Sequence, residues 1–509
     1  MRNSTPVIVG VGQIVERLDA TDYDGLTAVE LASRAVELAI ANAGADIVSN
    51  LDAMTVIRTF PDSVPKAVQP VLAPFGWPDN FAGCIADRLN ISGAEVNHSG
   101  ACGNEPQKWV GIFGSRIAAG EIRAAVICGA EAIATMRKAK AEGQSWDWTQ
   151  HSDYPVNDPG MNTDFMTETE LQRHGGAVPV SVYPLLEQAR RLSLGLSSED
   201  YALQMGALFA PFTEVAASNP YAMSQKTLSA TEIATITERN RMVGDPHPKS
   251  VVARDWVNQG AAVVIVSSAL ADSLGIADDK RVYVHGYADT VERVVLERPD
   301  LGVSPAMHSA YDVALAAAGK TFADMRYVDC YSCFPIAVFN ALDYFGLPLN
   351  GDVPYTLTGG LPYFGGPGNN YSMHGIAEAV ACARADRGAF ALVGANGGYM
   401  SKHSVGIYST EPCGWPENSN SRAQTELDAI GSVSLDLEPA GQYNLETYTV
   451  IYRGDQPQVA IAIGRSAATG HRAIAVSPDP DVMQRMGELA LGAQIAVNVG
   501  QPVNTFSIV

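Results

Sequence analysis

Two cysteine-bearing loops contain the residue types best suited to covalent chemistry. The first reads His-Ser-Gly-Ala-Cys-Gly-Asn-Glu-Pro and places Cys102 directly ahead of a predicted helix, with Pro106 in its first turn. A cysteine at this position faces free N–H groups and a partial positive charge, which lower the pKa of a thiol and favour the thiolate. The pattern therefore predicts that Cys102 is a nucleophile, and its structural alternative is a small buried cysteine in a tight turn.

The second loop follows a strand-like segment and reads Val-Asp-Cys-Tyr-Ser-Cys-Phe-Pro, with thiols at Cys330 and Cys333. This Cys-x-x-Cys spacing also occurs in redox and zinc sites, but the sequence supplies no second Cys-x-x-Cys or His-x₃-His partner. We therefore predict no metal site here. The chain has seven scattered cysteines and lacks an export signal, so we expect reduced thiols.

The elements that must position these loops form two similar stretches of chain. In each, a strand-like run precedes a helix that ends at a glycine, Gly44 in the first stretch and Gly319 in the second. A later buried strand contains Gly129 in the first stretch and Gly394 in the second. These two glycines are separated by nearly as many residues as Gly44 and Gly319 are. The similar offsets indicate a duplicated α/β unit.

The remaining segments differ in composition from these halves. The first half comprises residues 1–134 and 255–280, and it is interrupted by residues 135–254, a long insertion that we expect to form a loop or cap domain. The second half spans residues 281–409. The C-terminal part divides into a predicted linker, residues 410–436, and a domain of short strand-like runs with one helical segment, residues 437–509. This pattern predicts a small β-barrel of the oligonucleotide/oligosaccharide-binding (OB) type.

The overall composition limits the classes of partner. Apolar residues make up 47% of the chain and charged residues 17%, as in globular proteins with a large core. The net charge of −21 argues against nucleic acid and anionic membranes as partners. No run of roughly eighteen apolar residues predicts a transmembrane helix, and the N-terminal segment does not resemble a secretory signal. We therefore expect a cytoplasmic protein.

The Cys102 loop resembles the nucleophile loop of the thiolase superfamily, in which Cys-Gly-Ser-Gly or Cys-Ala-Ser-Gly precedes a helix and the cysteine is acylated. Here the match reads Cys102-Gly103-Asn104-Glu105. The resemblance extends over residues 1–409 and is closest to sterol-carrier-protein thiolases and bacterial thiolase-like, acetyl-CoA acetyltransferase-like proteins, some of which carry an added C-terminal barrel. It implies an α/β thiolase fold with duplicated βαβαβαββ halves, layered α-β-α-β-α, an inserted loop domain and a C-terminal OB-like barrel.

The resemblance also implies the ligands and partners. These are acyl-CoA or another acyl thioester, with coenzyme A as substrate or product and no other cofactor. A homodimer is possible because thiolases are usually dimers, and a monomer is the alternative if the added barrel covers the dimer surface. Basic residues of the loop domain are candidates for the CoA phosphates, without a choice among them: Arg137, Lys138, Lys140 and Lys249.

Three further loops resemble thiolase catalytic loops with altered residues. Tyr331-Ser332-Cys333-Phe334 resembles His-Asp-Cys-Phe, which implies that Cys333 is the acid/base catalyst and that Tyr331 replaces a histidine that holds the thioester oxygen. Gly365-Gly366-Pro367 resembles Gly-His-Pro, so Gly366 stands where the activating histidine is expected.

The last loop, Ala395-Asn396-Gly397-Gly398, resembles Cys-x-Gly without its cysteine. We expect N–H groups near Cys102, at Gly103, Gly366 and Gly398, to bind an oxyanion, with Asn396 in the same loop as Gly398. His374 and His403 lie close to these loops and are candidate bases, although a structural role is the commoner one for a single histidine.

The leading functional prediction is an acyltransferase of the acetyl-CoA C-acyltransferase class, in lipid metabolism, that works through a Cys102 acyl-enzyme. One alternative keeps the fold and changes the reaction to carbon acylation or to retro-aldol or retro-Claisen cleavage. The other alternative, supported by the missing histidine at Gly366, is a non-catalytic acyl-CoA-binding protein.

Overall fold

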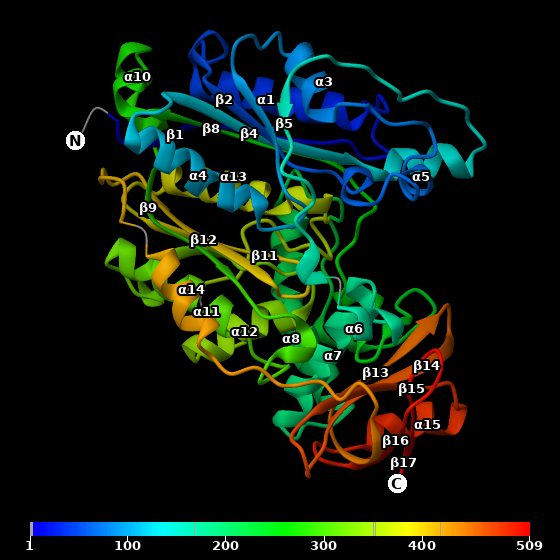
Figure 1. Cartoon of the computed structure of the whole chain (residues 1–509). Coiled ribbons are helices and arrows are strands. Elements are labelled where there is room, and N and C mark those ends of the chain that lie inside the picture. Colours follow the sequence, from blue (N-terminus) through cyan, green and yellow to red (C-terminus); the bar gives the residue numbers. More distant parts are fainter. Residues whose placement is uncertain (1–3, 167, 350, 352, 418) are drawn as a thin grey trace.

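The core consists of two β-sheets separated by a pair of helices (Figure 1). The computed structural model describes residues 4–166, 168–349, 351, 353–417 and 419–509. The first sheet has the strand order β1 (Pro6–Val15), β8 (Asn258–Ser267), β4 (Ala124–Ala132), β2 (Ala53–Val56), β3 (Glu95–His98), β5 (Val156–Asn157). The second sheet has the order β9 (Tyr283–Val291), β12 (Lys402–Ser409), β11 (Phe390–Gly397), β10 (Met325–Asp329).

The two sheets repeat one topology. In the first, β1 runs antiparallel to β8, β8 antiparallel to β4, and β4 parallel to β2. In the second, β9, β12, β11 and β10 follow in the same order with the same directions. The predicted duplication is therefore confirmed.

The packing of the outer helices repeats as well. Helix α1 (Ala28–Ala43) lies on β1, and helix α11 (Pro305–Ala318) lies on β9. A methyl group at Gly10 would come within 2.1 Å of a backbone oxygen of α1, and one at Gly286 within 2.0 Å of a backbone oxygen of α11. Both helices end at the predicted glycines, Gly44 and Gly319, in the left-handed conformation. Glycine is needed at Gly10 and Gly286 because the helix backbone approaches the strand so closely.

Helices cover the outer faces of the sheets and fill the space between them. The middle layer consists of α4 (Glu105–Ala119) and α13 (Tyr371–Ala385), which bury apolar side chains such as Phe113 and Ile376 between the two sheets. The outer layers contain α1, α3 (Phe81–Arg88) and α10 (Ser268–Ser273) on one side and α11 and α12 (Pro335–Phe345) on the other. This is the predicted α-β-α-β-α layering (Figure 1).

The insertion forms a mostly helical loop domain. Its elements are α5 (Ile133–Ala141), α6 (Thr169–Arg173), α7 (Pro179–Ser193), α8 (Ser198–Ser218), α9 (Ala230–Ala234), β6 (Met242–Gly244) and β7 (His247–Pro248). Helices α7 and α8 pack on α12 of the second half. The short strand β5 reaches back to the first sheet and covers the edge of β3. Short helix α2 (Gln69–Leu72) lies in the first half.

The C-terminal strands form a closed barrel. Its strands are β13 (Ala440–Arg453), β14 (Gln456–Arg465), β15 (Arg472–Ser477), β16 (Gln494–Asn498) and β17 (Thr505–Ile508), with α15 (Pro480–Arg485) between β15 and β16. The ring β13-β14-β15-β17-β16 closes because β13 pairs with both β14 and β16, and the pair β15–β17 is parallel. The predicted small barrel is present.

One expectation about the C-terminal part is wrong. The predicted linker contains helix α14 (Asn420–Asp428), which packs on α11. The barrel packs on α7 and β6 of the loop domain, where Thr447 donates to the Leu185 carbonyl. It lies away from the edge of the first sheet, where β5 pairs with β3.

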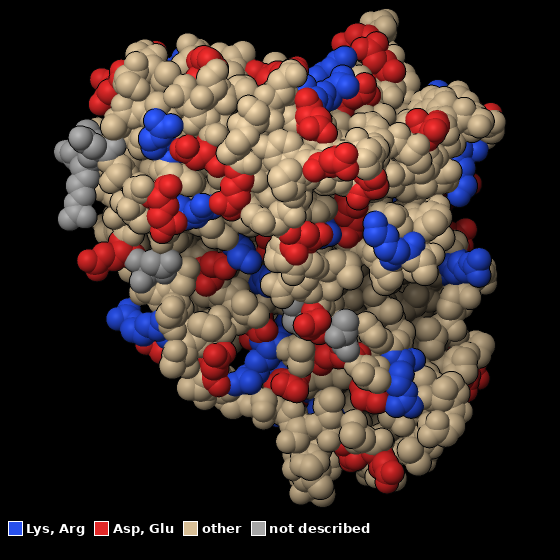
Figure 2. Space-filling model, turned by 45° about the horizontal axis from the view of Figure 1, so that its top comes forward, with Lys and Arg blue, Asp and Glu red and all other residues tan. Residues whose placement is uncertain are grey.

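Three further features concern the surface charges, the cysteines and the length of the helices. On the face shown in Figure 2, basic side chains lie among acidic ones. All seven cysteines are free thiols, and no helix among the described residues is long and apolar enough to cross a membrane.

Candidate functional site

Cys102 lies where the two halves of the core meet. It occupies the loop between β3 and α4, with 5% of its surface exposed and φ of 157°, a positive value that is uncommon for a residue with a side chain. Its side chain lies over Gly397 at the end of β11, since a methyl group at Gly397 would come within 2.5 Å of Cys102 Cβ. The N–H of Gly398 donates toward its sulfur. The predicted nucleophile and Gly398 are therefore brought together.

The electrostatics of Cys102 differ from the prediction. Burial raises the pKa of Cys102 to about 12, while the ammonium group of Lys402, the Gly398 N–H and Lys108 act in the opposite direction. The carboxylate of Glu105, the first residue of α4, raises it further. The net direction is opposite to the lowering that we expected at a helix N-terminus, because desolvation outweighs the nearby positive charges.

Cys333 and Tyr331 reach the same site from the loop between β10 and α12. Burial raises the pKa of Cys333 to about 12. The side-chain amide of Asn396 donates to its sulfur at 3.8 Å. The hydroxyl of Tyr331 lies against the nucleophile loop, because a methyl group at Gly103 would come within 2.1 Å of it. Burial and both thiols raise the pKa of Tyr331, which keeps its hydroxyl protonated and able to donate.

Tyr183 of helix α7 is a site residue that the sequence did not reveal. Its hydroxyl donates to the Gly398 carbonyl at 3.0 Å and accepts from the Asn396 amide at 3.0 Å and from the Met400 N–H at 3.2 Å. Its ring stacks on Phe334, with centroids 4.2 Å apart. The tyrosine comes from the insertion and belongs to no motif, so only the packing of α7 on the second half identifies it.

His403 faces away from Cys102. It lies on β12, and its Nε2 is 3.1 Å from the hydroxyl of Ser304, which begins α11 in the outer layer. The next residue, Ser404, contacts Asn104 in the middle layer instead. Because successive strand residues point to opposite faces, the predicted base is on the wrong side of the sheet. Burial lowers the pKa of His403 to about 3, as for a neutral core histidine.

His374 also points elsewhere. On α13, Ser372 donates to the Gly103 carbonyl at 2.7 Å and so faces the nucleophile loop. His374 lies two residues further round the helix, and its Nδ1 is 2.7 Å from the side-chain oxygen of Gln13 on β1. Burial lowers its pKa to about 3. The prediction of a replacement base at His374 is therefore wrong as well.

Gly366 holds its loop in place through its backbone. Its N–H donates to the Arg254 carbonyl at 2.7 Å. That bond uses the donor that we expected to bind an oxyanion, so this part of the prediction is wrong. A methyl group at Gly366 would lie 3.3 Å from the Arg254 carbonyl oxygen, which is a tight contact but not a clash.

Comparison with known proteins identifies the family. Residues 423–501 match the model of the thiolase-like protein type 1 additional C-terminal domain. The whole chain matches the crystal structure of a monomeric SCP2-thiolase like protein type 1 from Mycobacterium smegmatis, with 38% sequence identity, 100% of both chains covered and a TM-score of 0.84. The chain belongs to the type 1 thiolase-like family.

More distant structures share the thiolase fold of this type 1 thiolase-like chain. An Ltp2-ChsH2(DUF35) aldolase matches with 18% identity and a TM-score of 0.59, over 80% of this chain and 98% of that one. The dimeric peroxisomal thiolase of Saccharomyces cerevisiae matches with 12% identity and a TM-score of 0.56, over 81% and 98%. No curated protein sequence matches the chain.

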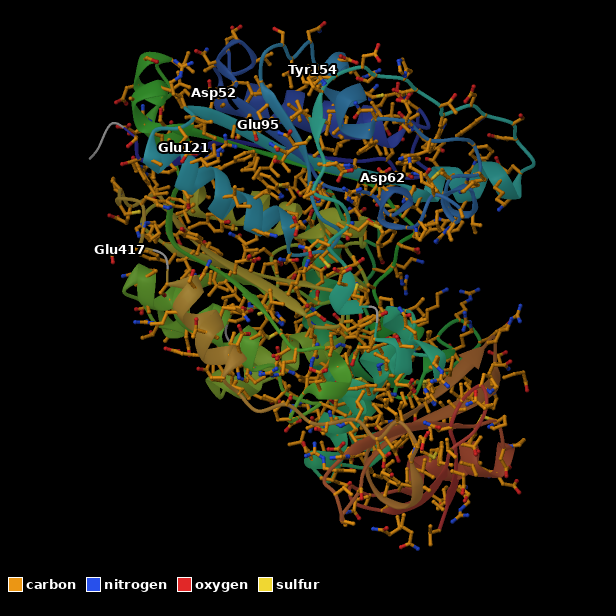
Figure 3. The ribbon with its side chains drawn as sticks, in the orientation of Figure 1. Asp52, Asp62, Glu95, Glu121, Tyr154 and Glu417 are labelled. Atoms are coloured by element: carbon orange, nitrogen blue, oxygen red, sulfur yellow. The ribbon has the colours of Figure 1, made fainter. Side chains whose placement is uncertain are left out.

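A cavity of about 760 Å³ borders the nucleophile loop. It lies between Gly100 and Lys108 on one side and residues 157–162 on the other. His98 also lines it, with Nδ1 3.8 Å from Asp158 and Nε2 4.0 Å from Asp62, which Figure 3 labels. This volume is within the range usual for small-molecule sites.

The candidates for the CoA phosphates divide into two groups. Arg137 pairs with Asp255, with one N–O distance of 2.7 Å, and Lys138 pairs with Glu142 at 2.9 Å. Lys140 and Lys249 are exposed. Carboxylates thus partly neutralise the charges of Arg137 and Lys138. Within the described residues, no group of three or more His, Cys, Asp or Glu side chains is arranged to hold a metal ion.

Proposed function

We propose that the chain is an acyltransferase that carries the acyl group of an acyl-CoA or 3-oxoacyl-CoA thioester on Cys102. The observation that carries the proposal is the convergence of Cys102, Cys333 and Tyr331 from the two halves of the core onto one buried site. A two-step acyl transfer needs a nucleophile, an acid/base catalyst and hydrogen-bond donors for the oxyanion. The two thiols, the Tyr331 hydroxyl and the N–H groups of the glycine-containing loops can supply them.

In the thiolytic direction the two thiols have separate roles. The sulfur of Cys102 forms a bond to the 3-oxo carbon, and the bond between carbons 2 and 3 breaks. The released enolate takes a proton from Cys333, and Cys333 receives the proton that Cys102 loses. Coenzyme A then displaces the acyl group from Cys102, and its thiol proton passes through Cys333 to the leaving sulfur of Cys102.

The oxyanion of each tetrahedral intermediate needs donors beside Cys102. The Gly398 N–H points at the sulfur, and the Tyr331 hydroxyl lies against Gly103, so both are placed to donate to an adjacent oxygen. Tyr183 orients this arrangement, because its hydroxyl joins the Gly398 carbonyl to the Asn396 amide. Coenzyme A enters as substrate or product, and the proposal includes no other cofactor.

Two alternatives have specific support. Carbon acylation or retro-aldol cleavage on the same fold is favoured by Gly366, because the side chain at this position offers no base. A non-catalytic acyl-CoA-binding protein is favoured by the pKa values of about 12 for both thiols.

The proposal extends to assembly and location. The solved Mycobacterium smegmatis relative is described as monomeric, which supports the same state for this chain. We propose that this chain too is a monomer that acts in the cytoplasm.

Incubation with acetyl-CoA and acetoacetyl-CoA, followed by intact and peptide mass spectrometry, tests the proposal. We expect one acyl group on the peptide that contains Cys102 and its release by coenzyme A. The variant Cys102→Ala should show none. Bound thioester without an adduct would leave only the non-catalytic alternative, and an adduct discharged by a carbon acceptor but not by coenzyme A would favour carbon acylation.

A further inference from the structure

Strand β12 places a lysine on the same face of the second sheet as Cys102. Lys402 pairs directly with Gly397 of β11, and the side chain of Cys102 lies over Gly397. Side chains of directly paired residues project from the same face of a sheet. Lys402 therefore projects toward the middle layer beside Cys102, whereas its neighbour His403 projects toward the outer layer.

The side chain of Lys402 is held in the interior. Only 5% of its surface is exposed, and its ammonium group donates to the Asn162 carbonyl at 2.9 Å. Residue 161 of the same segment accepts a hydrogen bond from the Ala101 N–H at 2.8 Å. One short segment of the loop domain therefore fixes both the nucleophile loop and the lysine.

Other charged groups surround this position, and the ammonium group of Lys402 also acts on the carboxyl group of Asp289. From α4, Lys108 and Glu105 form an ion pair at 3.3 Å. From β9, Asp289 accepts a hydrogen bond from Ser404, and burial raises its pKa. Three further titratable groups lie near the thiols: the neutral hydroxyls of Tyr331 and Tyr183, and the carboxyl group of Glu187, which raises the pKa of Cys333.

We propose that the ammonium group of Lys402 compensates the negative charge on the Cys102 sulfur during acyl transfer. This inference rests on the proposed function, because it assigns to Lys402 the electrostatic part of the role that a histidine at Gly366 would have. Lys402 acts through the charge of Cys102 and transfers no proton, so it is a positioning residue for the thiolate.

The balance of effects at Cys102 agrees with this role. Burial has the largest effect on the pKa of Cys102 and raises it, and among the charged groups Lys402 has the largest effect and lowers it. A cation that is buried beside a thiolate acts at a low effective dielectric, where its attraction is several times stronger than in water. Without Lys402, only the Gly398 N–H and Lys108 would oppose the effect of burial on the thiolate.

Alkylation of the free enzyme by iodoacetamide tests the inference without any thioester. The rate at Cys102 is followed by peptide mass spectrometry between pH 7 and 9.5 in the wild type, Lys402→Gln, Lys402→Arg and Cys102→Ser. The glutamine amide can still donate to the Asn162 carbonyl, so that variant removes mainly the charge. An opposite charge nearby changes a thiol pKa by about one to three units, and thiolates of higher pKa react faster, so we expect alkylation about 3- to 30-fold slower in Lys402→Gln.

The direction of the change separates charge from structure. A loosened site would expose Cys102 and speed alkylation, whereas loss of the ammonium group slows it. Lys402→Arg should keep the rate near that of the wild type. Equal rates in wild type and Lys402→Gln, or an unreactive Cys102 in the wild type at pH 9.5, would overturn the inference. If Lys402→Gln does not fold, Lys402→Met supports the same comparison.

The acyl-CoA experiment has a separate outcome. Slower alkylation in Lys402→Gln together with no acyl adduct in the wild type would sink the proposed function and leave the coupling of Lys402 to Cys102 intact. An adduct in the wild type with unchanged alkylation in Lys402→Gln would do the reverse.

Discussion

The two thiols of the site have similar burial and different neighbours. Burial raises the pKa of both Cys102 and Cys333 to about 12. Consecutive residues of β11 contact them, Gly397 on the Cys102 side and Asn396 on the Cys333 side. Cys102 faces an ammonium group and an N–H donor, whereas Cys333 faces the neutral hydroxyl of Tyr183 and an amide.

This difference suggests how two identical side chains take different roles. A buried thiol beside a cation bears negative charge at a lower free-energy cost, which suits a nucleophile. A buried thiol among neutral donors stays protonated and can give and take a proton, which suits an acid/base catalyst. Four predictions test this contrast, in order of decreasing effect.

Replacing Cys333 should separate acylation from turnover. We expect Cys333→Ala to lower the rate of thiolysis by about 10²- to 10⁴-fold, because it removes a proton donor, while Cys102 still gains an acyl group. Steady-state rates and intact mass measure the two steps. Cys330→Ala is the matched control, since Cys330 is a buried thiol that contacts Tyr311 instead of the site. Equal rates in both variants would remove the acid/base role.

The alkylation rate of Cys102 should rise steeply with pH. A thiol with a pKa of about 12 has a thiolate fraction that grows about tenfold per pH unit below that value, so the rate should grow about 100-fold between pH 7 and 9. Cys333 should follow the same slope at a lower rate. A plateau for Cys102 below pH 9 would show instead that the helix N-terminus dominates.

Removing the hydroxyl of Tyr183 should disturb Cys333 more than Cys102. Tyr183→Phe keeps the stacking on Phe334 and leaves the Asn396 amide and the Met400 N–H without their shared acceptor. We expect turnover to fall about tenfold and the free energy of unfolding to fall by about 1–3 kcal/mol. Kinetics and denaturant unfolding provide the two numbers, and a loss of acyl adduct on Cys102 would contradict the assignment.

His403 should matter least to the reaction. His403→Gln loses the contact with Ser304 in the outer layer and should lower the free energy of unfolding by about 1–3 kcal/mol. Turnover of the folded variant should stay within about twofold of the wild type, because the His403 ring contacts Ser304 and the Met400 carbonyl and faces away from Cys102. A large loss of turnover at unchanged stability would restore His403 as a base.

The duplicated core and the nucleophile loop could be predicted because local signals determine them. Gly44 and Gly319 end equivalent helices, and Cys102 precedes α4 as its flanking residues indicate. Helix α14 was missed because its residues are polar and small, and the sequence Asn-Ser-Asn-Ser-Arg is typical of a linker.

The side-chain environment of the site could not be predicted in the same way. The pKa of Cys102 depends on how completely other elements cover it, and Tyr183 arrives from an insertion with no motif. Strand alternation was the one local signal left unused. It places Lys402 and His403 on opposite faces of β12, and it would have favoured the lysine over the histidine.

Strand β8 has a consequence for how the protein is made. All ten of its residues are buried, and it lies between β1 and β4, yet the chain reaches it only after the whole inserted domain. A nascent chain that has emerged from the ribosome only as far as residue 257 holds β1 and β4 with unpaired edges. The first half therefore completes its sheet only after the inserted domain has been synthesised, and slow folding of that domain would prolong the exposure of these edges to aggregation.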